Sequence, residues 1–314
     1  MTTVFIKVMV IFLMIAAGFA ANRASVLPKE SSKYLSALLV DVTTPCLALS
    51  SIASQELNAD TWRTSSEVAV GSIIYFAVAM IFSALFVKAL KYEPAKDRGI
   101  LACLITSANT GFMGFPVSKA IFGNTIFFMF IIQNIVLNAY IYSGAIIQIN
   151  QGETKRISPV KVLSAMANPC MGATVIGILL LMSGIKLPSP AMDFFTTMGD
   201  STIPISMIVV GIQLGSSDLK AVFKNVKLTA CCLANVVLMP LLTLACVYFL
   251  PITDISKLTL VFAAAFPSAV LPVAIAEMEK KNSVLMSQGV SITTLMSMVT
   301  LPAWAILLMK LFNA

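Results

Sequence analysis

Residues 106–116 read Thr-Ser-Ala-Asn-Thr-Gly-Phe-Met-Gly-Phe-Pro and lie inside the otherwise apolar segment 99–122. Glycine costs about 1 kcal/mol and proline about 3 kcal/mol in a helix interior, and proline also frees the carbonyl four residues earlier. We therefore predict that this segment is an interrupted helix. A second segment, 258–278, contains Pro267, Ser268 and Pro272 and predicts a second interruption.

The composition of the chain places these segments in a lipid bilayer. Of 314 residues, 58% are apolar and 11% are charged, whereas a soluble domain is nearer half apolar and a quarter charged. The chain has no histidine, which removes the usual proton shuttle and the commonest metal ligand. Its six cysteines show no CxxC spacing, so neither a zinc site nor a disulfide framework is indicated. We predict an all-α integral membrane protein without a metal or cofactor.

Ten apolar segments are long enough to cross roughly 30 Å of hydrocarbon. They cover residues 4–21, 34–53, 68–90, 99–122, 125–149, 160–185, 192–214, 222–250, 258–278 and 283–312. The first has no small-residue cleavage site after it and is followed by nine others. It is therefore predicted to be a true transmembrane helix rather than a signal peptide.

Positive charge is distributed unevenly between the two sides of the predicted bundle. Fifteen of the 21 lysines and arginines fall in the loops that follow the odd-numbered spans. Because cytoplasmic loops carry such an excess, both termini are predicted to lie outside the cell membrane. The net charge of +7 then reflects this inner rim beside anionic lipid headgroups, and no nucleic-acid partner is inferred.

Three sequence features recur at about half the chain length. The sequence DVTTP at 41–45 matches DSTIP at 200–204, Pro116 matches Pro272, and Asn124 matches Asn282, at offsets of 156 to 159. These matches divide the chain into two five-span repeats, 1–157 and 158–314. Because five is odd, the second repeat would enter the membrane upside down. We predict an inverted repeat, the arrangement that underlies alternating access in secondary transporters.

The two interruptions predict a binding site. Unwound backbone at mid-membrane is tolerated only where protein buries it or where it lines a watery cavity. Half-helix N-termini present free N–H groups and positive dipole ends, which suit a carboxylate or another anion. Proline and glycine can instead simply kink or close-pack a helix, and a single proline would be interpreted in that way. The matched positions favour the site.

At these residues the sequence resembles the auxin efflux carrier family, whose fold is like that of bile acid/sodium symporters. This family includes the plant PIN-FORMED transporters and bacterial carriers proposed to move malate, malonate and related organic anions. The resemblance rests on N-T-x-x-M-G-x-P-x-x-K-A-x-x-G at 109–123 and on Pro267-x-x-x-x-Pro272. Asn168-Pro169 and G-x-x-L-G at 211–215 also fit, so the resemblance covers essentially the whole chain.

The resemblance implies a scaffold domain of spans one, two, six and seven, and a transport domain of spans three to five and eight to ten. The transport domain would carry the substrate in an elevator movement, and a homodimer is compatible with the family. The resemblance also implies ten helices in which the interrupted fourth and ninth spans cross. Asn109 would contact the substrate carboxylate, while Pro116 and Pro272 would shape the cross. The internal offset pairs Asn109 with Ala265, so the two half-sites are chemically unequal. The long cytoplasmic loop of many plant members is absent, and only 151–158 takes its place.

The predicted substrate site draws on both interruptions and on the fifth span. Its residues are Asn109, Thr110, Gly111, Pro116, Asn138, Pro267, Ser268 and Pro272. Gln133 and Asn134 lie on the same span as Asn138, and for all three amides hydrogen bonding between helices is the alternative interpretation.

Four carboxylates are candidates for coupling transport to protons or sodium. Asp41 and Asp200 lie deep in apolar spans, where a charged residue is a functional hypothesis by default. Each could instead serve structure, by holding the break at Pro45 or Pro204. Glu67 and Glu277 lie near span ends, where solvated or paired carboxylates are ordinary.

These observations predict a secondary active transporter of a small organic anion, such as a mono- or dicarboxylate or an auxin-like acid. The alternative is a membrane sensor that keeps the same fold and binds its ligand without transport. An enzyme is disfavoured because no nucleophile–base pair stands out. A channel is disfavoured because interrupted helices in inverted repeats suit a closed midplane site.

Overall fold

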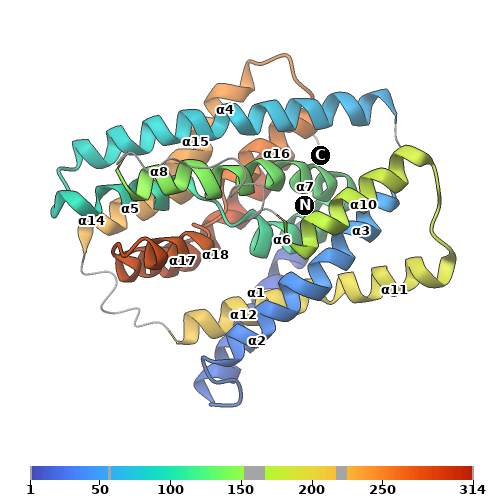
Figure 1. Ribbon diagram of the computed structural model, residues 1–314, viewed down its shortest axis with the longest axis horizontal. Helices are drawn as coiled ribbons and strands as arrows, with labels where there is room; N and C mark the ends of the chain where they lie inside the picture. The colour runs from blue at the N-terminus through green and yellow to red at the C-terminus, as the bar shows by residue number, and fades with distance from the viewer. Residues whose placement is uncertain (1, 56–57, 152–166, 217–224, 313–314) are drawn as a thin grey trace. The chain divides into compact units, whose positions relative to one another are not determined.

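The computed structural model describes residues 2–55, 58–151, 167–216 and 225–312, and every regular element within them is helical (Figure 1). The helices are α1 (Thr2–Arg23), α2 (Ser31–Leu38), η1 (Leu39–Thr43), α3 (Thr44–Ala53), α4 (Ala59–Ala89), η2 (Ala95–Asp97), α5 (Arg98–Thr106), η3 (Thr110–Gly114), α6 (Phe115–Phe122), α7 (Asn124–Tyr140), η4 (Ile141–Ala145), α8 (Ile146–Ile149), α10 (Pro169–Ser183), α11 (Ser189–Asp200), α12 (Thr202–Gly215), α14 (Val226–Leu233), η5 (Ala234–Leu238), α15 (Met239–Tyr248), α16 (Asp254–Ala264), α17 (Leu271–Met278) and α18 (Ser283–Phe312). The predicted all-α class is therefore confirmed. The inner-loop cations Lys155, Arg156, Lys161, Lys220 and Lys224, and the repeat boundary at 157–158, lie outside the described residues.

Within the described part of the chain, six helical segments are long and apolar enough to cross a membrane. They are Ser31–Ala53, Ala59–Ala89, Asn124–Ile149, Ser189–Gly215, Val226–Tyr248 and Ser283–Phe312. Met9–Arg23 and Pro169–Ser183 are shorter apolar helices. The two predicted interrupted spans are each divided into short helices, α5 and α6 in one and α16 and α17 in the other. The count of ten spans and their inverted repeat stay predictions.

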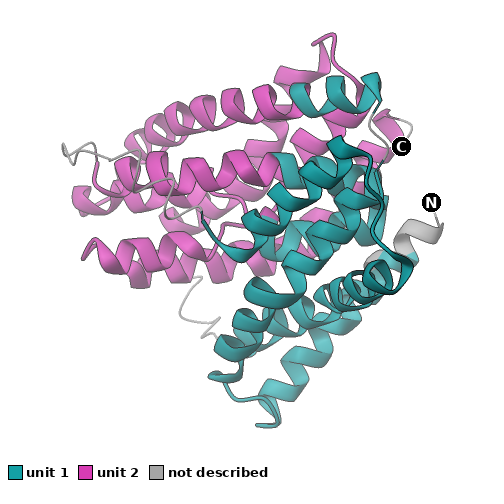
Figure 2. Cartoon of the chain, turned by 45° about the vertical axis from the view of Figure 1, so that its right-hand side comes forward, with its two compact units in different colours: residues 1–66, 111–132, 167–217 teal, residues 67–110, 133–166, 218–314 magenta. Residues whose placement is uncertain are grey.

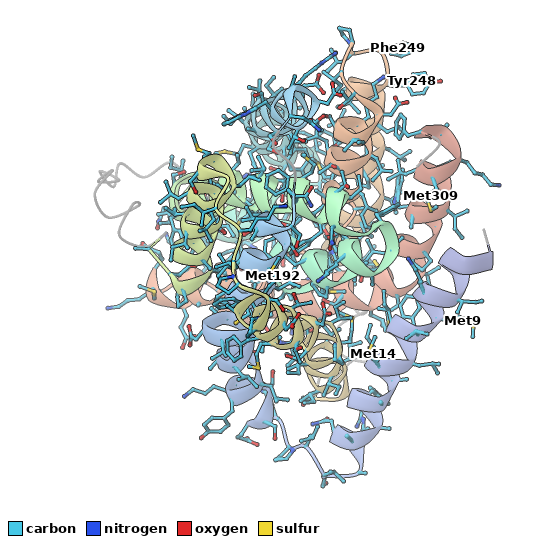
Figure 3. The ribbon with its side chains drawn as sticks, turned by 90° about the vertical axis from the view of Figure 1, so that its right-hand side faces the viewer. Met9, Met14, Met192, Tyr248, Phe249 and Met309 are labelled. Atoms are coloured by element: carbon cyan, nitrogen blue, oxygen red, sulfur yellow. The ribbon has the colours of Figure 1, made fainter. Side chains whose placement is uncertain are left out.

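Large apolar side chains are exposed on the helices, as expected for surfaces that face lipid. Met9 on α1 is 47% exposed, and it is labelled in Figure 3. Tyr248 and Phe249, labelled at the end of α15 in the same view, stack edge to face at 5.2 Å, and Phe249 is 86% exposed. Aromatic rings are enriched where membrane helices reach the lipid headgroups. The exposed apolar surface therefore agrees with a membrane environment.

The chain divides into two compact units (Figure 2). Unit 1 contains residues 1–66, 111–132 and 167–217, and unit 2 contains residues 67–110, 133–166 and 218–314. The boundary after Thr110 divides the first interrupted span, so that α5 belongs to unit 2 and α6 to unit 1. The scaffold and transport roles of the predicted domains stay a prediction.

Unit 1 is held together by close helix contacts at glycine. A Cβ atom on Gly211 of α12 would collide with the carbonyl oxygen of Ile15 on α1, and one on Gly199 of α11 would lie 2.7 Å from the Cα atom of Leu47 on α3. Small residues allow such close approach, which replaces the hydrophobic effect as the source of helix association in lipid. Helix α6 also belongs to this unit and packs against α1 and α12.

Unit 2 is built around α5. All residues from Gly99 to Thr106 are buried, and the helix contacts α8, α14, α17 and α18. A Cβ atom on Gly289 of α18 would lie 2.5 Å from the side chain of Leu104. Helix α16 packs against α15 and α18 in the same unit. Unit 2 therefore brings the ends of α5 and α16, which lead into the two interruptions, into one core.

Candidate functional site

The first interruption begins where α5 ends at Thr106. Ser107 adopts an extended conformation, with φ −80° and ψ 115°, and its amide still donates to the carbonyl of Cys103 at 2.9 Å. The chain continues through the π-helical turn η3, which contains Gly111, into α6. Pro116 lies two residues after η3, in a helical stretch that continues from Thr110 to Phe122. The predicted interruption is present, but it lies before η3 rather than at the proline.

The second interruption lies between Ala264, the last residue of α16, and Leu271, the first residue of α17. Pro267 and Ser268 belong to the unwound segment, whereas Pro272 lies in the first turn of α17 and is buried. Both prolines therefore stand where a regular helix is not required.

The two unwound segments pair with each other in unit 2. Ala108 and Ser268 form an isolated antiparallel β-bridge. The amide of Asn109 donates to the carbonyl of Pro267 at 2.7 Å, and the amide of Ala269 donates to the carbonyl of Ser107 at 3.2 Å. The bridge supplies hydrogen bonds that the interrupted helices lack, which is required of backbone that is buried away from water. We call these paired segments, residues 107–110 and 265–270, the crossing.

Side chains of the two unwound segments and of α18 reinforce the crossing. The hydroxyls of Ser107 and Ser268 lie 3.0 Å apart, and the hydroxyl of Thr293 on α18 accepts from the amide of Ser268 at 3.1 Å. Sequence reasoning missed Ser107 and Thr293. Ser107 stood inside the quoted stretch, but no spacing signal connected it to Ser268, and Thr293 lies in an unremarkable stretch of α18.

Helix α7 adds amide groups to the crossing. Asn134 donates from Nδ2 to the hydroxyl of Thr110 at 3.1 Å, and Asn138 donates from Nδ2 to Oδ1 of Asn134 at 2.9 Å. Oε1 of Gln133 is buried and has no hydrogen-bond partner among the described residues. The structure thus brings Asn109, Thr110, Pro267, Ser268 and, through Asn134, Asn138 into one cluster. Pro272 follows at the start of α17.

The crossing is polar but carries no formal charge. Residues 99–118 and 258–276 contain no Asp, Glu, Lys or Arg. Its polar groups are backbone amides and carbonyls, hydroxyls, and the side-chain amides of Asn109, Asn134 and Asn138. The side chain of Asn109 is 6% exposed. A ligand at the crossing would therefore be held by hydrogen bonds and helix dipoles rather than by a charged residue of these segments.

A buried network of neutral side chains supports α5 immediately before the crossing. Gln148 donates from Nε2 to the hydroxyls of Ser83 at 3.1 Å and Thr106 at 3.3 Å, and Tyr140 donates to Oε1 of Gln148. Ser83 and Thr106 also bond to each other at 3.0 Å. These contacts tie α4, α5 and α8 together, and sequence reasoning missed them because their members are scattered along three spans.

Glu67 on α4 contacts the other interrupted span at the start of α16. Its Oε2 atom accepts from the amide and the hydroxyl of Thr253 and from the hydroxyl of Ser256, each at 2.8 Å. Thr253 is the N-cap of α16, so the carboxylate sits at the positive end of that helix dipole. Glu67 therefore fixes the start of α16. Glu277, the other predicted carboxylate near a span end, is exposed in α17.

Asp200 forms an ion pair in unit 1. Its Oδ1 atom lies 2.7 Å from Nζ of Lys119 on α6. Asp41 lies in the π-helical turn η1, is exposed, and makes no ion pair or hydrogen bond with any residue that the structure describes. Thr43 and Thr202, each two residues after one of these carboxylates, have buried hydroxyls without a partner among the described residues.

Comparison with known proteins agrees with this architecture. Residues 3–305 match the membrane transport protein family. A protein of Methanothermobacter thermautotrophicus called an uncharacterized transporter is 22% identical over 96% of this chain and 97% of its own length. An uncharacterized transporter of Methanocaldococcus jannaschii is 21% identical over 96% of this chain and 98% of its own length. The chain belongs to the membrane transport protein family, which includes the auxin efflux carriers it resembles, and is a multi-pass membrane transporter.

Proposed function

We propose that this chain is a secondary active transporter that moves a small organic anion, such as a mono- or dicarboxylate or an auxin-like acid, across the cell membrane. The observation that carries the proposal is the crossing, where two interrupted helices are joined by an antiparallel bridge and surrounded by neutral hydrogen-bonding groups. Interrupted helices that meet at mid-membrane are the usual location of a transporter's substrate site. The substrate-binding residues in this proposal are Asn109, Thr110, Gly111, Pro116, Asn138, Pro267, Ser268 and Pro272.

The chemistry of the crossing supports an anion. The crossing and α7 present side-chain amides and hydroxyls, groups that donate hydrogen bonds to carboxylate oxygens, and no aspartate or glutamate in 99–118 or 258–276 would repel one. The N-terminus of α17 adds backbone N–H groups and a positive dipole end. A neutral site of this kind would bind its substrate with moderate strength, which permits release on the far side.

Elevator movement is the proposed mechanism. In this mechanism the transport domain, spans three to five and eight to ten, carries the crossing between the two sides, and the scaffold of spans one, two, six and seven stays in place. The inverted repeats 1–157 and 158–314 would give two nearly equivalent end states. Both termini would lie outside. Asp41 and Asp200 are the stronger candidates for coupling to a proton or sodium ion, because both lie deep in apolar spans whereas Glu67 and Glu277 lie near span ends.

Counterflow in proteoliposomes tests the proposal. Vesicles loaded with an unlabelled carboxylate are diluted into labelled carboxylates, one at a time, with and without an imposed pH or sodium gradient. We expect saturable uptake that unlabelled substrate inhibits by competition and that is absent from protein-free vesicles. Ligand-dependent thermal stabilisation without flux under any gradient would contradict the proposal and support a sensor instead.

A further inference from the structure

The ion pair between Lys119 and Asp200 is placed where a fixed surface pair would not be expected. Asp200 lies in the apolar segment Ser189–Gly215, eleven residues from its start and fifteen from its end. At 1.5 Å per residue these separations correspond to about 16 and 22 Å, so the carboxylate is near the middle of the span. The side chain of Lys119 is 16% exposed, and that of Asp200 is 55% exposed. An ionised pair at this depth is a functional hypothesis by default.

A second carboxylate occupies the matching position of the other repeat. Asp41 lies in Ser31–Ala53, about 15 Å from its start and 18 Å from its end by the same rise per residue. It belongs to the same unit as Lys119 and Asp200, and its turn η1 packs against both α11 and α12. Asp41 has no ion-pair partner among the residues that the structure describes. Unit 1 therefore contains two equivalent carboxylates and pairs Lys119 with one of them.

The segment that carries Lys119 connects the two units. Residues 111–132 pack in unit 1 but continue at both ends into unit 2, at Thr110 and at 133. In the proposed elevator movement, span four, which carries Lys119, would shift against spans two and seven, which carry Asp41 and Asp200, and Lys119 would leave Asp200. A lysine ammonium without a partner at mid-membrane is energetically unfavourable, so the movement needs a second acceptor.

We propose that Lys119 exchanges its partner from Asp200 to Asp41 during each transport step. This inference rests on the proposed function and concerns how its two end states are held. In the predicted topology Asp200 lies slightly toward the outer side and Asp41 slightly toward the inner side of the midplane. Inward movement of α6 therefore carries the ammonium from the first carboxylate toward the second. Each end state keeps one ion pair, and only the intermediate lacks it.

Cross-linking tests the exchange directly. The six free cysteines are replaced by alanine in the full chain, and Lys119→Cys is combined separately with Asp200→Cys, Asp41→Cys and Val42→Cys. Each variant in proteoliposomes is treated with a bifunctional thiol reagent whose spacer matches the length of the lysine–aspartate pair. Val42 is the matched control, because it is exposed beside Asp41 but points in a different direction around the helix.

We expect cross-links from position 119 to both 200 and 41, and at least tenfold less to 42. Cross-linking to 200 alone, with and without carboxylates and at both signs of the membrane potential, would overturn the exchange, as would equal cross-linking to 41 and 42. The readout does not require flux. If position 119 cross-links to both positions but the protein transports no carboxylate, this inference stands and the proposed substrate is wrong.

Charge removal gives a second measurement. We expect Asp41→Asn and Asp200→Asn each to lower the rate of carboxylate counterflow at least tenfold. Asp193 is an exposed carboxylate on the same helix as Asp200, and Asp193→Asn should leave that rate unchanged. A fixed structural pair predicts a different result, in which Asp200→Asn slows counterflow and Asp41→Asn does not. That result would overturn the proposal.

Discussion

The first and second interrupted spans meet at one bridge, but different chemistry holds each of them. Helix α5 is supported by the neutral network around Gln148 and by close packing at Gly99. Helix α16 is supported by a carboxylate, Glu67, at its N-terminus. The first interruption is also followed by the π-helical turn η3, whereas the second leads directly into α17. Helix α5, which leads to Asn109, is thus supported at its C-terminal end by neutral groups, whereas a carboxylate holds the N-terminus of α16.

The crossing is therefore not a symmetric site. Asn109 has no amide counterpart in the second span, because the internal offset pairs it with Ala265 and the bridge places it opposite Pro267. The second span contributes backbone and a hydroxyl, whereas the first contributes the side-chain amide. Recognition and anchoring can therefore be separated by mutation.

The largest effect is expected from Gly99→Ala. A Cβ atom at this position would collide with the carbonyl oxygen of Gln148, and shifting that backbone would cost free energy. We expect a loss of about 3 kcal/mol or more in the free energy of unfolding in detergent. Gly172→Ala is the matched control, because nothing lies within 4 Å of its added Cβ atom. Equal stability of the two variants would show that α5 does not depend on this contact.

The next effect concerns the anchor of the second span. Glu67→Ala leaves the amide of Thr253 and two hydroxyls without their acceptor, and we expect it to cost about 3 kcal/mol of stability. Glu277→Ala removes an exposed carboxylate and should change stability by less than about 0.5 kcal/mol. Thermal unfolding of both variants measures the contrast. A Glu67→Gln variant that unfolds like the wild type but no longer responds to an ion gradient would assign Glu67 to coupling instead.

Asn109→Ala tests recognition by the first span. Alanine keeps the backbone hydrogen bond to Pro267 and removes the side-chain amide. We expect the apparent affinity for substrate to fall at least tenfold, equivalent to about 1.4 kcal/mol. Concentration-dependent uptake measures it, with Asn124→Ala, an exposed asparagine, as the control. Wild-type affinity in the Asn109 variant would remove this residue from the site.

The smallest effect is expected at the hydroxyl pair across the bridge. Ser107→Ala and Ser268→Ala should each cost about 1 kcal/mol, because each removes the same 3.0 Å hydrogen bond. For that reason the double variant should lose less than the sum of the single losses, as a double-mutant cycle of unfolding free energies measures. Strictly additive losses would mean that the two hydroxyls do not interact.

The interruptions could be predicted from sequence because their causes are local. Glycine and proline disfavour a helix interior wherever they occur, so 106–116 and the segment around Pro267 and Pro272 were identified by residue type alone. The same reasoning placed Asn109, Thr110 and Ser268 at a common site, and the structure brings them together. Apolar length likewise identified the long helices, because membrane thickness fixes it.

The pairings within the site could not be predicted in this way. The bond between Ser107 and Ser268 depends on the register of two unwound segments, and no periodicity specifies that register. Lys119 was part of the family motif, but its partner Asp200 lies 81 residues further along the chain. The role of Glu67 similarly depends on where α16 begins in space. Long-range contacts of this kind follow from packing rather than from local preference.

Amide hydrogens in unwound segments usually exchange quickly with solvent, because no regular hydrogen bonding protects them. The amides of Asn109 and Ala269 are exceptions, since each donates to a carbonyl of the opposite interrupted span. Their exchange requires the bridge to open, whereas the amide of Thr110 donates to the nearby carbonyl of Ala108 and can open locally. Hydrogen–deuterium exchange at Asn109 and Ala269 should therefore occur at matched, slow rates. Such matching, between amides far apart in the chain, would be the kinetic signature of a crossing that opens and closes as one cooperative unit.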